Sequence, residues 1–241
     1  MSPFASIVYP FRWSLLDSGM NIHSACRSGK KLPLSIQGVK EGLEIKMVAV
    51  QQERSGREHI LNTARDLFTT HGFHQTSMAE LAAAAKISVG QIYRLFKGKE
   101  DIIEALIGAD MKDRIGKIEE LRLRLEAGRI NIEQTFEHLV LLSLRDKDEA
   151  LSFDILAEAL RNRPVGETVS AMFQRFRHFL RDFACVANPA LSGEALDGAE
   201  EVILACIFGL GHRSLSLPNL SDECTARHAA QMIVAALKGV S

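Results

Sequence analysis

From Ser55 onward, apolar residues recur at spacings of three and four along most of the chain, which is the pattern of amphipathic helices. The first such stretch would place these side chains on one helical face: Ile60, Leu61, Ala64, Leu67 and Phe68. Gly72 follows as a residue suited to a left-handed helix end. Ser55-Gly-Arg-Glu58 has the spacing of a capping box, so we predict that this helix begins near Ser55.

Two short helices come next. Ser77-Met-Ala-Glu80 repeats the capping-box spacing and opens a helix rich in leucine and alanine. A turn at residues 86–88 leads into a third helix, from Val89 to Phe96, which ends before Gly98. Two short helices joined by a tight turn and braced by a preceding helix are the geometry of a DNA-reading helix-turn-helix.

The rest of the chain predicts six longer helices. The first begins near Lys99 and ends near Gly128, and the others span 131–145, 148–162, 165–187, 193–216 and 222–238. Asn131, Ser192 and Ser221 are candidate N-caps. No strand pattern or repeat competes, so we predict an all-α protein: a three-helix head followed by a larger helical domain.

Composition narrows the function classes. The 241 residues are 46% apolar and 24% charged, with a net charge of -1, as in an ordinary globular protein. The four cysteines show no metal-like spacing, and no nucleophile–base pair or glycine-rich phosphate loop is visible. The apolar stretch 202–211 is too short to span a bilayer. We therefore expect a cytoplasmic protein that is not an enzyme and holds no cofactor or metal.

Residues 1–46 differ in character. They contain three prolines and the single tryptophan, lean basic, and lack a sustained helical or strand period. A disordered tail, a misassigned start before Met47, a basic arm reaching DNA and a folded element all remain open. The predicted division is a tail at 1–52, a helix-turn-helix domain at 53–100 and an effector-binding and dimerisation domain at 101–241.

Positive charge gathers at the second helix of the turn. Between residues 86 and 99 there are four basic side chains and no acidic one, whereas the span 53–104 as a whole is neutral. The basic residues are Lys86, Arg94, Lys97 and Lys99. A local basic patch is what binding to DNA phosphates requires, even in a protein with almost no net charge.

The ordered run over this region resembles the N-terminal domain of the TetR family of regulators. The matching residues are Gly72-Phe73-His-Gln-Thr76-Ser77-Met-Ala-Glu80-Leu81-Ala82, Ile87-Ser88-Val-Gly90-Gln-Ile92-Tyr93-Arg-Leu-Phe96 and Lys97-Gly-Lys99-Glu100. The resemblance covers about 50 residues, and the remaining two-thirds match the family only in helical layout. Two positions depart from it: Lys86 stands where the family commonly has glycine, and Val89 where it commonly has lysine.

The resemblance implies DNA contacts that physical chemistry supports. Gln91 and Arg94 are the best readers of base edges, because glutamine suits adenine and arginine suits guanine. Gly90 would let the recognition helix lie close to the groove. Phosphate contacts are expected from Thr76, Tyr93 and Lys99. Ser88, Val89 and Lys97 complete the predicted DNA-binding set, while Phe73, Leu81, Ile92 and Phe96 would pack the core.

The helical domain carries two further implied roles. Helices 193–216 and 222–238 are rich in small and apolar residues, and in the family the last two helices pair with their symmetry mates in a dimer. Aromatic and methionine side chains of the middle helices could form the core or line an effector cavity. The candidates for effector binding are Phe136, Phe153, Met172, Phe176, Phe179 and His178.

The sequence therefore predicts a homodimeric DNA-binding regulator, a repressor released from a pseudo-palindromic operator by a small apolar or amphipathic effector. The long helix starting at Lys99 would be the one element able to carry a change in the body to the head. One alternative is a regulator with the same head that responds to a protein or to no ligand. An all-helical enzyme or carrier is the alternative from another class.

Overall fold

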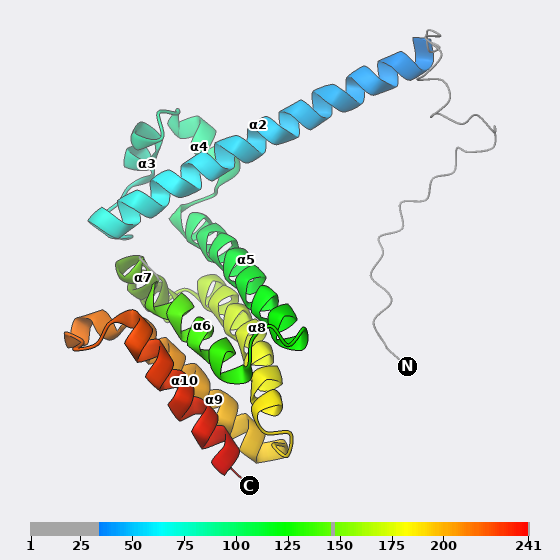
Figure 1. Cartoon of the computed structure of the whole chain (residues 1–241). Helices are drawn as coiled ribbons and strands as arrows, with labels where there is room; N and C mark the ends of the chain where they lie inside the picture. Colours follow the sequence, from blue (N-terminus) through cyan, green and yellow to red (C-terminus); the bar gives the residue numbers. More distant parts are fainter. Residues whose placement is uncertain (1–33, 146–147, 241) are drawn as a thin grey trace. The chain divides into compact units, whose positions relative to one another are not determined.

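A computed structural model describes residues 34–145 and 148–240, and in these ranges it contains nine α-helices, one 3-10 helix and no strand (Figure 1). The all-α class is therefore confirmed. The α-helices are α2 (Leu34–His71), α3 (Met78–Ala84), α4 (Val89–Leu95), α5 (Lys99–Glu126), α6 (Ile132–Leu144), α7 (Glu149–Ala159), α8 (Arg163–Ala187), α9 (Gly193–Gly211) and α10 (Asp222–Gly239). The chain divides into two compact units, residues 1–54 and 55–241.

Helix α2 begins much earlier than the sequence pattern predicts. It starts at Leu34, so the predicted start at Ser55 is wrong and the Ser55–Glu58 spacing lies inside the helix. The physical reason is that no proline lies between residues 34 and 71, and that the helix formers Lys, Glu, Met, Ala and Gln are frequent up to Arg54. The part of the predicted tail before residue 34 lies outside the described residues.

Helices α3 and α4 are both opened by reciprocal caps. Ser77 N–H donates to Glu80 Oε2 at 2.7 Å while Glu80 N–H donates to Ser77 Oγ at 3.1 Å, as the spacing predicts. These bonds lower the pKa of Glu80 below its ordinary value, because they favour the carboxylate. Ser88 and Gln91 make the same pair of bonds at the start of α4, which sequence reasoning missed.

The apolar face of α2 packs against α3, α4 and α5. The predicted core residues Phe73, Leu81, Ile92 and Phe96 are each at most 1% exposed, and the rings of Phe68 and Phe73 meet edge to face at 5.3 Å. The same buried cluster also contains Leu151 of α7 and Val165 of α8. The core of the helix-turn-helix head thus continues into the helical body, and the predicted domain boundary near residue 100 stays a prediction.

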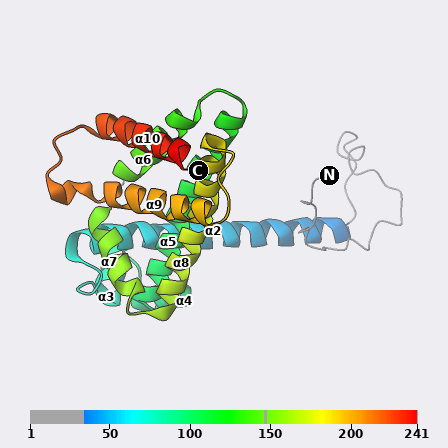
Figure 2. The same cartoon turned by 90° about the horizontal axis from the view of Figure 1, so that it is seen from below.

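A second core lies among α5, α6, α8, α9 and α10, where α6 packs closely on both α9 and α10 (Figure 1, Figure 2). The rings of Phe136 and Phe183 meet at its centre with centroids 6.4 Å apart. Asn131 and Ser221 cap α6 and α10 through their side chains, as predicted. Helix α9 ends at Gly211, earlier than predicted, and a 3-10 turn covers Arg213–Ser216.

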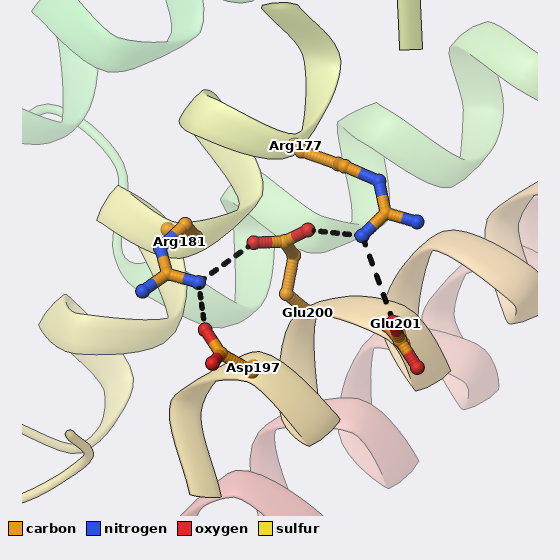
Figure 3. Close-up of polar contacts among 5 residues, drawn as sticks. All are labelled: Arg177, Arg181, Asp197, Glu200 and Glu201. Atoms are coloured by element: carbon orange, nitrogen blue, oxygen red, sulfur yellow. Dashed lines mark hydrogen bonds and ion pairs between the residues drawn. The ribbon is translucent and has the colours of Figure 1, made fainter. Parts of the chain in front are cut away.

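An ion-pair network joins α8 to α9 (Figure 3). Glu200 of α9 is 4% exposed and accepts hydrogen bonds from Arg177 at 2.7 Å and from Arg181 at 3.0 Å. Hydrogen bonds to Asp197 and Glu200 raise the pKa of Arg181 above its ordinary value. Because both carboxylate oxygens of Glu200 are paired, its burial is compensated and the two helices are held in register.

Candidate DNA-binding surface and effector cavity

Helix α4 has a buried face and an exposed face. Ile92 and the following Phe96 are buried in the head, whereas Val89 is 44% exposed, Tyr93 is 52% exposed and Arg94 is also exposed. Ser88, Gly90, Gln91 and Lys97 are exposed as well. The structure thus brings eight of the predicted DNA-contacting positions close together along α4 and its flanks, with Lys99, half-buried, at the start of α5.

Gly90 lies inside α4 on the exposed face. A Cβ atom built there would meet only Ser88 Oγ, at 4.0 Å, among the described atoms outside the local backbone, so packing within the head does not require glycine. Glycine inside a helix costs about 0.5–1 kcal/mol relative to alanine. Packing within the head therefore gives no reason for glycine at this position, and the close approach of DNA to this face stays a prediction.

The side chain of Gln91, which the sequence assigns to base reading, also takes part in the cap of α4. Its side-chain carbonyl accepts the Ser88 N–H at 2.8 Å, which closes the cap of α4. Bidentate reading of adenine needs both the carbonyl and the amide group of glutamine. In this conformation the carbonyl of Gln91 is therefore already engaged in the cap, and the contact of Gln91 with adenine stays a prediction.

Thr76 does not have the position that was predicted for it. The residue is 2% exposed, and its hydroxyl donates to the carbonyl of Gly72 at 2.9 Å. A buried hydroxyl with this partner fixes the loop before α3 and is a poor ligand for phosphate. We therefore remove the Thr76 side chain from the predicted DNA-binding set.

Lys86 occupies the turn between α3 and α4 with a φ of 55°, in the left-handed region. This conformation costs a residue with a Cβ atom about 1–2 kcal/mol, which explains why glycine suits this position. Lys86, which departs from the family pattern, therefore strains the backbone of the turn. It also adds one positive charge beside α4.

Exposed apolar side chains lie on the last two helices. Val202 of α9 is 63% exposed and Met232 of α10 is 73% exposed, although both helices contribute their opposite faces to the body core. A contiguous exposed apolar patch is a common mark of a protein contact, whereas a single exposed apolar side chain is ordinary. These are the helices for which the sequence predicts dimerisation.

A cavity of about 170 Å³ lies among α5, α6, α7, α8 and α9. Its wall is mostly apolar, and of the predicted effector residues it includes Met172 and Phe176. The polar lining is formed by Asp110, Arg114, Ser143, Ser152 and His212.

The other four predicted effector residues lie outside this lining. Phe136 is fully buried in the body core, and Phe179 packs against the same core. His178 is exposed on α8 and lies 3.8 Å from Asp182. Phe153 is 40% exposed, with its ring 4.5 Å from that of His212. Helical periodicity could not separate these positions, because core and cavity lie on neighbouring stripes of the same helices.

Helix α7 contacts the head directly, so the expectation that the helix starting at Lys99 is the one link between body and head is wrong. Asp154 of α7 accepts the backbone N–H of Phe73 at 2.9 Å. Arg65 of α2 donates hydrogen bonds to Asp110 of α5 and to Asp148, the residue before α7. Burial opposes the charge of Arg65, but these two carboxylates outweigh it and raise its pKa.

In the described ranges, His, Cys, Asp and Glu side chains form no cluster of three or more suited to a metal ion. None of the helices in that part of the chain combines the length and apolar character needed to cross a membrane.

The three helices α2 to α4, with an exposed basic face on α4, define a helix-turn-helix protein of the DNA-binding class. Residues 60–106 match the model of the family described as bacterial regulatory proteins, tetR family. Residues 60–106 of the chain are thus similar to the N-terminal helix-turn-helix domain of TetR-family regulators.

Named relatives agree with this assignment. The transcriptional regulator UidR of Escherichia coli strain K12 is 34% identical over 110 residues, which are 45% of this chain and 54% of UidR. The chain thus aligns with about half of that relative's length. The transcriptional repressor BepR of Brucella suis biovar 1 is 25% identical over 183 residues, which are 76% of this chain and 77% of BepR. Both relatives are named as regulators, in agreement with the expectation of a protein that is not an enzyme.

Solved structures share the fold beyond the head. The structure of Salmonella enterica GusR aligns with a TM-score of 0.57 and 25% identity, covering 77% of this chain and 94% of GusR. A regulator from Mesorhizobium loti aligns with a TM-score of 0.62 and 19% identity, which is a likeness of fold alone.

Proposed function

We propose that this protein is a cytoplasmic, homodimeric transcriptional repressor that binds double-stranded DNA through α4. The carrying observation is the exposed face with Val89, Gly90, Tyr93 and Arg94, which the packing of the head does not explain. Arg94 would read a guanine edge, Val89 a thymine methyl group, and Tyr93 with Lys97 would hold phosphates.

The dimer would form through α9 and α10. Val202 and Met232 supply exposed apolar side chains on these helices, and pairing with a symmetry mate would bury them. A two-fold dimer presents two α4 helices, so the operator would be pseudo-palindromic, with half-sites about 34–36 Å apart or a multiple of this. In light scattering, Met232→Glu would shift the protein towards a monomer, while the exposed Lys112→Glu on α5 serves as the control.

The cavity would hold the effector. Its volume of about 170 Å³ is close to that of ~150 Å³ apolar cavities that take up benzene-sized molecules. The mostly apolar wall, together with the polar lining residues Asp110, Arg114 and His212, favours an amphipathic molecule.

Selection of duplexes from a random-sequence library by the full-length protein tests the DNA-binding function. We expect a pseudo-palindromic sequence to be enriched, and Arg94→Ala to lose preference at one base position per half-site, at about 1–3 kcal/mol. Arg129→Ala, at an exposed arginine in the turn after α5, is the matched control and should select the same sequence. Absence of any enriched sequence would favour a helical enzyme or carrier instead.

A second measurement distinguishes the proposed repressor from a regulator that responds to a protein or to no ligand. A library of small amphipathic molecules is titrated against the protein–operator complex, and release of DNA by a molecule that binds wild type but not a cavity-filled variant supports the effector role. Binding of DNA that no molecule in the library alters would favour the alternative.

A further inference from the structure

The ring of His212, the residue after α9, forms part of the cavity wall. Its side chain is 17% exposed. The ring contacts two phenylalanines, with its centroid 4.5 Å from that of Phe153 on α7 and 4.8 Å from that of Phe208 on α9. These two contacts restrain the imidazole, so its polar atoms hold a defined place in a wall that is otherwise mostly apolar.

A carboxylate faces this ring from the start of α7. Glu149 Oε1 lies 3.8 Å from His212 Nδ1, which is too far for a hydrogen bond but within reach of an ion pair. Both atoms are buried, and neither has a hydrogen-bond partner among the described residues. The other oxygen, Oε2, accepts a hydrogen bond from Ser214 of the 3-10 turn. The charge of the neighbouring Arg213 is compensated by Asp222 of α10, so Glu149 is the group that acts directly on the imidazole.

The position of Glu149 selects the tautomer of a neutral His212. A carboxylate only accepts hydrogen bonds, so the proton is favoured on Nδ1, the ring nitrogen beside Oε1, and the lone pair is then on Nε2. Nε2 is therefore the base that can take a proton from a molecule in the cavity. The resulting imidazolium has a carboxylate 3.8 Å away, and an opposite charge at this distance favours the charged form.

The other charges of the cavity wall favour an anion over a cation. Among the described lining residues, Asp110 and Arg114 of α5 are charged, whereas those contributed by α6, α7, α8 and α9 are uncharged. The carboxylate of Asp110 accepts a hydrogen bond from Arg65 of α2, which compensates its charge. A negative group in the cavity thus meets the guanidinium of Arg114 and a protonated His212. A cation meets only a carboxylate that is already bonded to an arginine.

We propose that the cavity binds a small, mostly apolar organic acid with one weakly acidic hydroxyl, such as a phenol, and that His212 Nε2 takes its proton. This inference rests on the proposed effector role of the cavity. The O–H bond of the acid breaks and an N–H bond forms on the imidazole, which leaves an oxyanion beside an imidazolium with no change in total charge. Glu149 stabilises the imidazolium and is the positioning residue of the pair.

The proton transfer makes the affinity depend on pH. A neutral acid brings its own proton to a neutral imidazole, so no proton is exchanged with solvent. In alkaline solution the acid is already ionised, and the complex must take up one proton as it forms. The affinity should therefore fall about tenfold per pH unit once the free acid is ionised. An apolar molecule without the hydroxyl should bind equally well at either pH.

Two matched probes test this assignment with the full-length protein. The compounds para-nitrophenol and para-nitrotoluene share a ring and a nitro group, and differ in an acidic hydroxyl against a methyl group. Ionised nitrophenol is yellow, so its absorption reports the position of the proton. Calorimetry should show tighter binding of nitrophenol, with the yellow form present at a pH at which the free probe is mostly neutral. Leu204→Trp, which adds volume to the cavity wall, should remove binding of both probes, whereas Leu204→Ala should retain it.

Substitutions at the pair separate its chemistry from its packing. His212→Phe keeps an aromatic ring beside Phe153 and Phe208 but removes the base. It should raise the Kd of nitrophenol about 10–100-fold, abolish the yellow form, and change the Kd of nitrotoluene by less than about twofold. Glu149→Gln keeps the shape but removes the charge, so it should lower the yellow fraction of bound nitrophenol. His178→Phe, at an exposed histidine of α8 outside the cavity lining, is the matched control.

Two results would overturn the assignment to a weak acid. One is equal affinity for nitrophenol and nitrotoluene when Leu204→Trp removes the binding of both. The other is an unchanged Kd and yellow fraction of nitrophenol in His212→Phe. Failure of both probes to bind wild type is a separate outcome, because it contradicts the proposed effector role of the cavity itself. None of these results bears on DNA binding, which the selection of duplexes tests independently.

Discussion

Lys99 donates hydrogen bonds from Nζ to the carbonyl of Phe73 at 2.8 Å, and its ammonium group lies 4.8 Å from the centroid of the Phe73 ring. A second bond runs to the carbonyl of His74 at 3.1 Å. The lysine that the sequence assigns to a DNA phosphate therefore also fixes the loop between α2 and α3 to the start of α5.

Because Lys99 is assigned both to a DNA phosphate and to the loop before α3, we predict two effects of Lys99→Ala. The loss of charged hydrogen bonds and of the cation–π contact should lower the free energy of unfolding by about 1–2 kcal/mol. The variant should also bind all DNA sequences more weakly, with a slope of log affinity against log salt reduced by about one unit. Lys97→Ala, at an exposed lysine two residues earlier, should reduce the slope without changing stability. Full stability in Lys99→Ala would show that the loop contacts contribute little.

Gln91 should be sensitive to the kind of substitution made. Gln91→Glu keeps an acceptor for Ser88 N–H, so α4 should stay capped, but the added negative charge should weaken binding to every sequence. Gln91→Ala removes the bond from Ser88 N–H but keeps the bond from the backbone N–H of residue 91 to Ser88 Oγ, so it should lower the free energy of unfolding by only about 0.5 kcal/mol, with relaxed preference at one base position. Urea unfolding and a panel of single-base operator variants separate the two effects. Unaltered base preference in Gln91→Ala would assign Gln91 to the cap alone.

Glycine in place of Lys86 should increase the stability of the turn between α3 and α4. Lys86→Gly removes the strain of a φ of 55°, and after the greater entropy of the unfolded chain is subtracted it should stabilise the protein by about 0.5–1 kcal/mol. The same substitution at Lys112, exposed within α5, should destabilise by about 1 kcal/mol. Thermal unfolding measures both, and a loss of stability in Lys86→Gly would mean that the lysine side chain contributes more than the strain costs.

The contact between α7 and α8 should be intolerant of added volume at Gly166. A Cβ atom there would lie 2.6 Å from the carbonyl oxygen of Ala159, so Gly166→Ala should destabilise the protein by about 1–3 kcal/mol. At Gly108 of α5, where nothing lies within 4 Å of the added atom, alanine should stabilise by about 0.5–1 kcal/mol. Chemical denaturation compares the two, and equal effects would argue against the close approach of α7 and α8.

Removal of residues 1–46 should leave the melting temperature and the oligomeric state unchanged. Met47 is 65% exposed and Val50 is 60% exposed, and Ile60 is the first buried residue among those of α2 whose side chains the structure describes. Calorimetry and light scattering on the shortened chain test this. A substantial fall in melting temperature would show that the N-terminal segment contributes to the fold.

The sequence by itself determined the helices and the DNA-binding head, because both depend on local order. The spacing of Ser77 and Glu80 specifies a cap, and the alternation of buried Ile92 and Phe96 with exposed Tyr93 and Arg94 follows from helical geometry. A helix start that depends on one capping residue, such as the start of α6 at Asn131, could also be predicted from the sequence.

The start of α2 depended on local helix propensity that the capping-box spacing concealed, whereas residue partners were decided by longer-range contacts. The start of α2 at Leu34 shows that a capping-box spacing inside a run of good helix formers does not interrupt the helix. Thr76 and Lys99 have the residue types of phosphate ligands, yet one is buried against Gly72 and the other is bonded to Phe73. Such partners depend on which chain segments meet, and no spacing along the sequence encodes that.

The cavity and the contacts of α7 with the head belong to the tertiary structure alone. Met172 and Phe176 line the cavity, whereas Phe179 lies outside its lining, because the three residues from Phe176 to Phe179 turn α8 about 60° short of a full turn. Asp154 and Phe73 are 81 positions apart, and a carboxylate on an exposed-looking stretch of helix carries no sign of a distant N–H. Their contact exists because the packing of α7 and α8 on the head core brings them together, which is a property of the folded chain and not of any local pattern.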